Sequence, residues 1–437
     1  MANKSMNYAP SAPYRLPVIE ALCSYESIEL MFNYKKLIFF FIFITTIVFN
    51  VSIADTIEDL KLIQILKDDV NDVDGLGNPR SIKVSSDNSK VFVSSGDDNA
   101  FAVFNLDNNF NLTFSQVFKN SSVNINGLEG ATGLIYLEHS NQVVVTGFYD
   151  GALTLFSRKI RDYSFNGTIS DGLSYKRVFD SDVPVGKLDT LGLLGAWDVV
   201  NTINEKQLLV ASYMSNAISI FDITPDEEII FNRTVKNAKP LEDNLGKPIS
   251  LALSPFNDEL YVLGFEKHQL TIFDRSKEGD LLVKQVIKNG ADGVKQFVNP
   301  QKIVVSPNGK FLYIACAGSN SIVVFHKVDT GQYAFLQAIN NSDIGGSGLE
   351  GAGSLAISSD GSRVYAAGES DIGLYLFEAG DNGILSFKNK LLSVRDNELK
   401  KISSITLTSD NRHLLVATGK DNSLFVFKIK KDRLHET

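Results

Sequence analysis

The feature that most constrains the fold is an apolar run ending in phenylalanine, which recurs along the whole chain. The runs read FAVF, LTLF, ISIF, LTIF, IVVF, LYLF and LFVF, and they end at Phe104, Phe156, Phe221, Phe273, Phe325, Phe377 and Phe427. Consecutive copies are 52 residues apart, except for one step of 65 residues and a last step of 50. A nearly fixed period of this size is the signature of a solenoid, a propeller or another repeat array.

Each repeat has the same internal order of short strands and turns. A first strand such as SLALS or KIVVS leads through a turn such as SPNG or SSDG into a second strand such as FLYIAC or RVYAAG. The phenylalanine run is the third strand, and a run such as LLVKQVIKN or YAFLQAINN is the fourth. Four antiparallel strands per unit and seven units predict an all-β fold, a seven-bladed β-propeller. A solenoid with this much strand per repeat is the alternative.

The seventh repeat lacks a fourth strand of its own. After SLFVFKI the chain has only a short polar tail, whereas LKLIQILKDD, Leu60 to Asp69, has the fourth-strand pattern and precedes the first repeat. We therefore expect the N-terminal strand to pair with the last blade and close the ring, which removes the exposed sheet edges of an open array. Deletion of residues 55–70 should then unfold the ring.

The first 54 residues have the pattern of a segment that precedes a folded domain. Lys35 and Lys36 are followed by an uncharged apolar run from Leu37 to Val51 and by small residues up to Ala54. A basic start, a short apolar run and small residues before the cleavage point are typical of a secretory signal peptide. We expect export to the periplasm or the medium; an uncleaved anchor is the alternative.

These patterns divide the chain into three parts. We expect residues 1–30 to be a non-native or disordered extension, with Met31 as the true start. Residues 31–54 are the predicted signal peptide, and residues 55–437 are the predicted propeller. The mature chain would keep one cysteine, Cys316, which we expect to be a buried small hydrophobe in the strand FLYIACAG.

Charge and motifs exclude several classes of function. The net charge of −9 and the absence of a basic face argue against a nucleic-acid binder. The five histidines show no metal-ligand spacing, and there is no G-x-S-x-G elbow, no phosphate loop and no dinucleotide fingerprint at a strand-to-helix turn. The expected partner is therefore a small molecule, a glycan or an envelope protein, bound by a monomer.

Three of the repeats carry a family resemblance. SSDNSKVFVSSGDDNAFAVF, SPNGKFLYIACAGSNSIVVF and SSDGSRVYAAGESDIGLYLF resemble the repeats of lactonase-like, YVTN-type seven-bladed propellers, over roughly residues 60–430. The GLEGA segments at Gly127–Ala131 and Gly348–Ala352 resemble an exported bacterial branch of that group. The family includes sugar-lactone hydrolases, relatives of cycloisomerases and exported proteins without assigned chemistry. No catalytic motif of the family matches here, so none is transferred.

The resemblance implies a ligand site at the mouth of the central channel, where the first strand of each blade begins. Aligning the repeats places one residue of each unit in a single column at that point: Arg80, Thr132, Trp197, Ile249, Gln301, Gly353 and Ser403. Just before the column lie Glu129 and Glu350, in the two GLEGA segments.

We predict catalytic roles for Glu129, Glu350 and Arg80, and ligand-binding roles for Trp197, Gln301 and Asp198. The two glutamates could act as general base and acid or hold a calcium ion in the channel. Arg80 could stabilise an oxyanion or bind a carboxylate, and Trp197 could stack on a sugar ring. The structural alternatives are solvated loop acids, an arginine that pairs with them and a packing tryptophan. Ligand spacing predicts no metal site.

Two functions stay open at this stage. The first is an exported propeller that serves as a ligand- or protein-binding scaffold. The second is a lactone hydrolase, similar to a 6-phosphogluconolactonase, with its site at the channel mouth. The repeats establish an architecture and contain no catalytic constellation, which favours binding.

Overall fold

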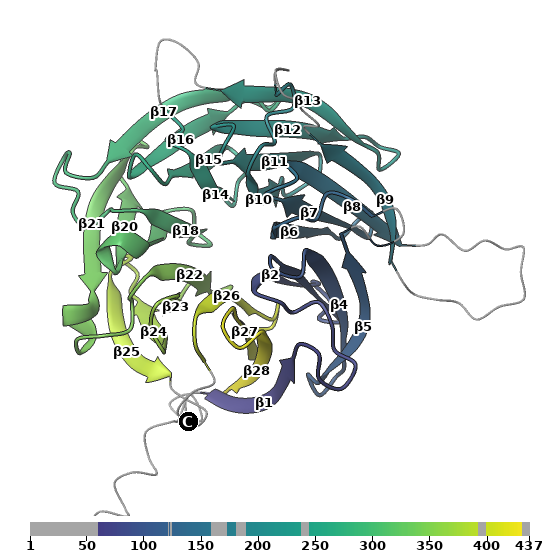
Figure 1. Ribbon diagram of the computed structural model, residues 1–437. Coiled ribbons are helices and arrows are strands. Elements are labelled where there is room, and N and C mark those ends of the chain that lie inside the picture. Colours follow the sequence, from purple (N-terminus) through teal and green to yellow (C-terminus); the bar gives the residue numbers. More distant parts are fainter. Residues whose placement is uncertain are drawn as a thin grey trace, which may run out of the picture. The chain divides into compact units, whose positions relative to one another are not determined.

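The computed structural model describes residues 60–120, 122, 125–158, 173–180, 189–236, 244–391 and 399–430. In these residues, 28 strands form seven antiparallel sheets of four strands, arranged as blades in a ring (Figure 1). The prediction of an all-β, seven-bladed propeller is confirmed. The predicted signal peptide and the extension before it lie outside the described residues, as do residues 159–172 and 181–188 within the 65-residue step.

Blades 1 to 4 are each built from four consecutive strands, ordered from the channel outwards (Figure 1). Blade 1 holds β2 (Pro79–Val84), β3 (Lys90–Ser95), β4 (Ala100–Leu106) and β5 (Leu112–Lys119). Blade 2 holds β6 (Ala131–Leu137), β7 (Gln142–Gly147), β8 (Ala152–Arg158) and β9 (Leu173–Asp180). Blade 3 holds β10 (Ala196–Asn201), β11 (Gln207–Ser212), β12 (Ala217–Ile223) and β13 (Ile229–Lys236). Blade 4 holds β14 (Pro248–Leu253), β15 (Glu259–Gly264), β16 (Gln269–Arg275) and β17 (Leu281–Lys288).

Blades 5 to 7 follow the same order, and the last blade takes its outer strand from the start of the domain. Blade 5 holds β18 (Pro300–Val305), β19 (Phe311–Cys316), β20 (Ser321–Lys327) and β21 (Tyr333–Asn340). Blade 6 holds β22 (Ala352–Ile357), β23 (Arg363–Gly368), β24 (Leu374–Ala379) and β25 (Leu385–Leu391). Blade 7 holds β26 (Ile402–Leu407), β27 (His413–Thr418), β28 (Ser423–Ile429) and β1 (Leu60–Lys67). Two short 3-10 turns, η1 (Ala317–Ser319) and η2 (Asn341–Ile344), complete the described elements. No described helix has the length and apolar character needed to cross a membrane.

The antiparallel order gives the ring two unlike faces. The innermost strand of each blade begins at one face, which also carries the turns between second and third strands; we call this the mouth face. The turns between first and second strands, and between third and fourth strands, lie at the opposite end, which we call the back face. Side chains in equivalent turns of neighbouring blades therefore come together on the same face.

The predicted closure of the ring is confirmed by the pairing of β1 with β28. Leu62 pairs with Phe427 and Gln64 with Val426, so that one residue bulges out between them. The fourth strand of blade 1 bulges at the same place, opposite Phe104. Gln64 also donates to the carbonyl of Leu112 (2.9 Å) and accepts from its N–H (2.7 Å), which ties the closing strand to the outer strand of blade 1.

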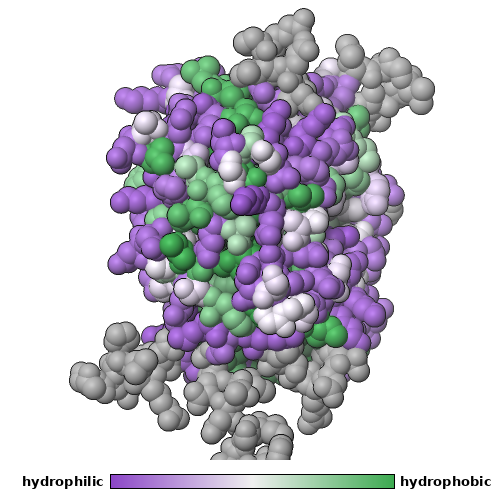
Figure 2. Space-filling model, turned by 90° about the vertical axis from the view of Figure 1, so that its left-hand side faces the viewer, coloured by the Kyte–Doolittle hydropathy of each residue, from purple (hydrophilic) through white to green (hydrophobic). Residues whose placement is uncertain are grey.

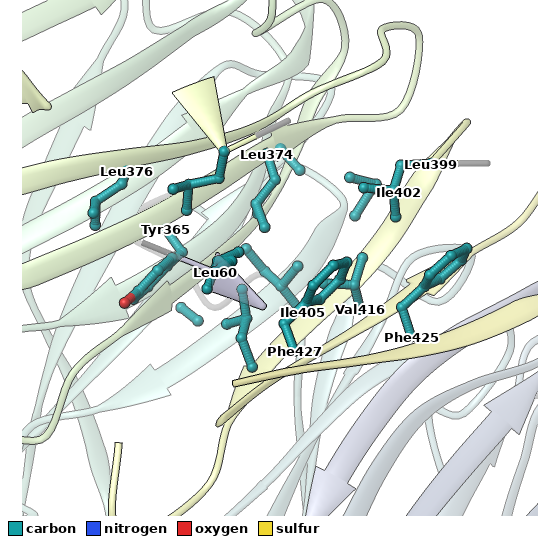
Figure 3. Packing of buried hydrophobic residues seen from close by; sticks show 14 of the residues in the cluster. Leu60, Tyr365, Leu374, Leu376, Leu399, Ile402, Ile405, Val416, Phe425 and Phe427 are labelled. Atoms are coloured by element: carbon teal, nitrogen blue, oxygen red, sulfur yellow. The ribbon is translucent and has the colours of Figure 1, made fainter. Parts of the chain in front are cut away.

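The core lies between successive blades and includes the closing strand. The seven repeated phenylalanines are all at most 5% exposed, and each belongs to a cluster shared by two neighbouring blades. Figure 3 shows Leu60 of β1 among side chains of blades 6 and 7, including Leu376 and Phe427. Truncation of such a buried aromatic residue to alanine costs about 3–5 kcal/mol, so the recurring phenylalanine is explained by packing.

The outer wall and the single described cysteine carry no sign of a site. The side of the ring that β21 borders mixes hydrophilic and hydrophobic side chains (Figure 2). Exposed apolar residues such as Leu282 and Phe387 occur on the outer strands β17 and β25, and single exposed apolar residues are common on protein surfaces. Cys316 is fully buried, and burial raises the pKa of its thiol well above the usual value. It is the buried small hydrophobe that the sequence predicted.

Candidate functional site at the channel mouth

The innermost strand of every blade begins with a β-bulge. In six blades the first and third residues of the strand pair with consecutive residues of the second strand, so the residue between them has no register partner. In blade 2 the bulge takes up Thr132 and Gly133. A bulge bends the strand and redirects a side chain, and bulges are common beside functional sites. The single bulged residues of the other blades are Arg80, Trp197, Ile249, Gln301, Gly353 and Ser403.

The bulged residues of all seven blades line one cavity of about 100 Å³. They form the column that aligning the repeats places at the channel mouth, so the structure brings these residues together. The residue after each bulge lines the cavity as well. These second positions are mostly small and polar, with two charged exceptions: Ser81, Gly133, Asp198, Ser250, Lys302, Ser354 and Ser404.

Four charged side chains line the cavity as two loose ion pairs. Arg80 lies 3.7 Å from Glu369, and Lys302 lies 3.8 Å from Asp198. Both distances are close to the limit of an ion pair, and Arg80, Glu369 and Lys302 keep between 29% and 39% of their side-chain surface exposed. Such pairs contribute less than about 1 kcal/mol each. The charged groups therefore remain available to a ligand.

Asp198 also has a structural role at this point. Its Oδ2 accepts a hydrogen bond from the N–H of Leu251 in blade 4 (3.0 Å). Ser354 and Ser404 occupy the same position in their blades, and each accepts from the N–H of an isoleucine in the next blade. The position is thus a clamp between neighbouring blades. Ser250, which also occupies it, is 1% exposed and its hydroxyl has no partner among the described residues.

A third positive charge, Lys83, lies deeper in the channel on β2. Its side chain is exposed to solvent, but it is closely surrounded by protein atoms and lies near Lys302 and Asp198. That burial, together with the charge of Lys302, lowers the pKa of Lys83 to about 8, against the opposing effect of Asp198. Near the cavity, three cationic side chains therefore face two carboxylates, a balance that suits an oxyanion.

One half of the mouth is aromatic and the other is small or polar. The first residue of each turn between second and third strands is Phe148, Tyr213 or Phe265 in blades 2 to 4. Trp197 packs edge-on against Phe148 with ring centroids 5.3 Å apart, and Tyr213 packs against Phe265 at 6.3 Å. In the other four blades the same position holds Gly96, Ala317, Glu369 and Gly419.

The two predicted glutamates lie outside the cavity. Glu129 is exposed, and the hydrogen bonds of its backbone to Asp150 and Tyr149 hold a turn. Glu350 is exposed too, but it lines a neighbouring depression of about 440 Å³ that shares Gln301 with the cavity. Of the six predicted residues, Arg80, Trp197, Asp198 and Gln301 line the cavity. The roles predicted for all six remain predictions.

The sequence did not single out Glu369, Lys302 or Lys83. Glu369 follows the second strand of blade 6, and the repeats alone do not show that it lies near Arg80. Lys302 and Lys83 follow the predicted column by one and three residues on their strands. A search for charged residues at the positions after the column would have found both.

Comparisons with known proteins agree with this geometry. Residues 195–388 match the family model described as a lactonase, 7-bladed beta-propeller. Over these residues the chain is similar to that family, and its fold is a seven-bladed propeller. A comparison of the chain with curated proteins finds no match.

Solved structures share the fold of this propeller at low identity. A putative 6-phosphogluconolactonase from Bacteroides uniformis ATCC 8492 superposes with a TM-score of 0.57 at 15% identity, over 77% of this chain and 89% of that one. A second one, from Bacteroides fragilis NCTC 9343, gives 0.57 at 18%, over 75% and 86%. The Cps50 (Swd1) β-propeller domain of Myceliophteria thermophila gives 0.59 at 12%, over 85% and 100%. At these identities the similarity shows the fold alone.

The channel of this propeller does not fit a calcium ion. The two carboxylates that line the cavity, Asp198 and Glu369, lie near three cationic side chains, Arg80, Lys302 and Lys83, so the described site has no excess of negative charge for a divalent cation. Among the described residues, a group of acids close enough to share a metal is Asp68, Asp69 and Asp74, which lies in the connection from β1 to β2. Burial, followed by the charges of Asp98 and Asp69, raises the pKa of Asp68 to about 6.

Proposed function

We propose that the protein binds a small ring-shaped ligand with an acidic group at the mouth of its central channel. One observation carries the proposal: seven bulged strands converge on a single cavity that Arg80, Lys302 and Trp197 line, and Trp197 packs against Phe148 on the aromatic side of the mouth. Guanidinium and ammonium groups bind oxyanions through charge-assisted hydrogen bonds, and aromatic rings offer apolar faces to a ring.

The cavity and the neighbouring depression differ in size, and we expect each to hold a different part of the ligand. A volume of about 100 Å³ admits one polar group, well below the several hundred Å³ of a pocket that encloses a whole small molecule. The neighbouring depression of about 440 Å³ is lined by residues of blades 4 to 6, among them Phe265, Gly318 and Ser370. The acidic group would enter the cavity, and the ring would lie in the depression beside Gln301.

Lactone hydrolysis is the second candidate, and the pairing of Arg80 with Glu369 favours it. Glu369 could accept a proton from an attacking water while Arg80 stabilises the oxyanion that forms at the lactone carbonyl. Two structural neighbours are named putative 6-phosphogluconolactonases. Binding stays the first proposal because the residues that line the cavity include neither histidine nor cysteine.

The test is calorimetric titration of the full chain with sodium glucuronate, a sugar ring with one carboxylate, run beside acid release from glucono-1,5-lactone. We expect saturable glucuronate binding that Arg80→Gln weakens by roughly tenfold or more, and no lactone turnover above buffer. Lys310→Gln, which removes an exposed positive charge from a turn on the back face, is the matched control and should bind normally. Turnover abolished by Glu369→Gln would replace binding by hydrolysis, and equal binding by wild type and Arg80→Gln would remove the mouth as the site.

We further propose that the protein is exported. The support is the basic, apolar and small-residue pattern of residues 31–54, which lie outside the described residues. N-terminal sequencing of the protein recovered outside the cytoplasm should begin at Asp55. A chain that stays with the cytoplasm and keeps residues 31–54 would contradict export.

A further inference from the structure

A groove on the back face, between blades 3 and 4, is separate from the channel mouth. It has a volume of about 460 Å³, within the usual range for small-molecule sites. The turn between β10 and β11 forms one wall, and the β14–β15 and β16–β17 turns form the other. The residues that line it include the guanidinium of Arg275 and the ring of Phe256.

Arg275 keeps unused hydrogen-bond donors in this groove. Its Nη1 donates to the carbonyl of Asn257 and its Nη2 to Oε1 of Gln207, each at 2.8 Å. The buried Nε–H has no acceptor among the described residues. A guanidinium has five N–H donors, so each terminal nitrogen of Arg275 keeps one further hydrogen. Half-buried donors without acceptors call for an explanation.

The charge of Arg275 is not neutralised by a neighbouring carboxylate. Among the described residues, no acid lies within ion-pair distance of it, and both of its acceptors are neutral. Burial, and then the charge of Arg233, lowers the pKa of Arg275. Arg233 has its own counter-ion, Asp280, at 3.0 Å. Arg275 is the member of this arginine pair that lacks one.

The acids on the walls are engaged elsewhere. Asp222 accepts from Nε2 of Gln207 (2.8 Å) and from Nδ2 of Asn232 (2.5 Å), and Asp258 accepts from the hydroxyl of Ser254. The lining contains three cationic and three acidic side chains. A groove of balanced charge with one uncompensated guanidinium suits a ligand with a single negative charge better than a polyanion.

The neighbouring interface shows the same two positions with a counter-ion present. Lys327 follows Phe325 by two residues, as Arg275 follows Phe273, and Glu259 begins the second strand of its blade, as Gln207 does. Between blades 4 and 5, Lys327 donates to Oε2 of Glu259 at 2.8 Å. Between blades 3 and 4, the carboxylate is replaced by the amide of Gln207, and the negative charge is missing.

We propose that the groove between blades 3 and 4 binds a small organic monocarboxylate, whose carboxylate supplies the missing counter-ion of Arg275. The apolar part of the ligand lies against Phe256, whose side chain is 69% exposed at the groove. The site lies on the opposite face from the channel mouth and does not depend on the function proposed there.

The test uses benzoate as the probe and benzamide as its uncharged counterpart, in calorimetric titrations of the full chain at constant ionic strength. Arg275→Gln removes the guanidinium. The double variant Gln207→Glu/Asp222→Asn moves one carboxylate next to Arg275, keeps the net charge and preserves the hydrogen bond between positions 207 and 222. Asp222→Asn alone is the matched control, and Arg80→Gln reports any binding at the channel mouth.

We expect wild type, Asp222→Asn and Arg80→Gln to bind benzoate in preference to benzamide. Arg275→Gln and the double variant should bind benzoate at least about tenfold more weakly, and circular dichroism should show the double variant folded even if Arg275→Gln is not. Equal benzoate binding by the double variant and wild type would overturn the proposal. The proposal would also be overturned if wild type bound neither benzoate nor benzamide, or if Arg80→Gln were the only variant that lost benzoate binding.

Discussion

Two neighbouring blade interfaces use the same backbone positions for opposite purposes. Between blades 4 and 5, the buried Glu259 receives Lys284 at 2.6 Å and Lys327 at 2.8 Å, and Tyr261 donates to it at 2.7 Å. Between blades 3 and 4, Gln207 stands in the place of the glutamate and leaves Arg275 without a counter-ion. In the interface between blades 4 and 5, the charges are compensated within the protein, and we call this a closed network. In the interface between blades 3 and 4, Arg275 lacks a counter-ion and lines a groove, and we call this an open network.

The difference shows how a repeat fold separates stability from binding. The strands fix where each side chain lies, while single substitutions at equivalent positions decide whether the charges are compensated inside. In a closed network, removing one partner leaves the other charge buried and unpaired, which strongly destabilises the folded state. An open network lacks the stabilisation of a compensated charge pair, but its hydrogen-bond donors are available to a ligand.

The largest expected effect on stability comes from opening the ring, because both interfaces form only within a closed ring. Deletion of residues 55–70 removes β1, its pairing with β28 and the clasp between Gln64 and Leu112. Because every blade packs on two neighbours, we expect the cooperative unfolding transition to disappear, as followed by circular dichroism during heating. A truncated chain that melts like the full chain would show that neither interface needs closure.

Opening the closed interface should have the next largest effect. Glu259→Gln leaves Lys284 and Lys327 without their carboxylate, and should lower the free energy of unfolding by about 3 kcal/mol in urea at neutral pH. Glu278→Gln, an exposed acid at the groove rim, is the control and should change it by less than about 0.5 kcal/mol. An equal shift in both variants would mean that the two interfaces do not differ.

The pH dependence of the closed interface follows from the same contacts. Burial alone would raise the pKa of Glu259, but the hydrogen bonds from Lys284, Lys327 and Tyr261 outweigh it and hold the pKa below its usual value. The folded state therefore favours the ionised form. Its contribution to stability should be present above pH 4.5, the ordinary pKa, and be lost as pH falls through the lower folded value. Glu259→Gln should lack this loss.

A third interface, between blades 7 and 1, sharpens the comparison with a smaller effect. His413 holds the position of Gln207 and Glu259, is 3% exposed and stacks on Phe110. Burial lowers the pKa of His413, so the neutral ring is favoured in the folded state. Stability should fall as pH decreases below about 6.5, the ordinary pKa of histidine, and His413→Gln should flatten this slope in thermal melts. An unchanged slope would assign the pH dependence to other groups.

Much of the fold and part of the mouth could be predicted from the sequence, because both follow from repetition. The period located the phenylalanine column, the blade order and the missing strand that β1 supplies. Alignment of the repeats also placed Arg80, Trp197 and Gln301 in one column. The β-bulges that direct the residues of this column into the channel could not be predicted from the local sequence pattern, since they depend on the packing of neighbouring blades.

Contacts across blades explain what the sequence could not show. Glu369 reaches Arg80 only because the ring brings blades 6 and 1 to a common axis. Gln207 and Arg275 lie 68 positions apart in sequence, and neither belongs to a recognised motif. Glu129 and Glu350 drew attention as a repeated pair, yet the glycine-rich turns that repeat them also hold their side chains at the surface.

Fluorescence of Trp197 tests the central claim, a ligand site at the channel mouth, most directly. Trp197 is the single tryptophan of the chain and lines the cavity, so its emission reports occupancy of the mouth without any added label. The account predicts a saturable change with glucuronate, at the concentrations that calorimetry gives, which persists in Gln207→Glu/Asp222→Asn and is lost in Arg80→Gln. Calorimetric binding of glucuronate that leaves Trp197 emission unchanged, or an emission change that Arg80→Gln does not weaken, would contradict it.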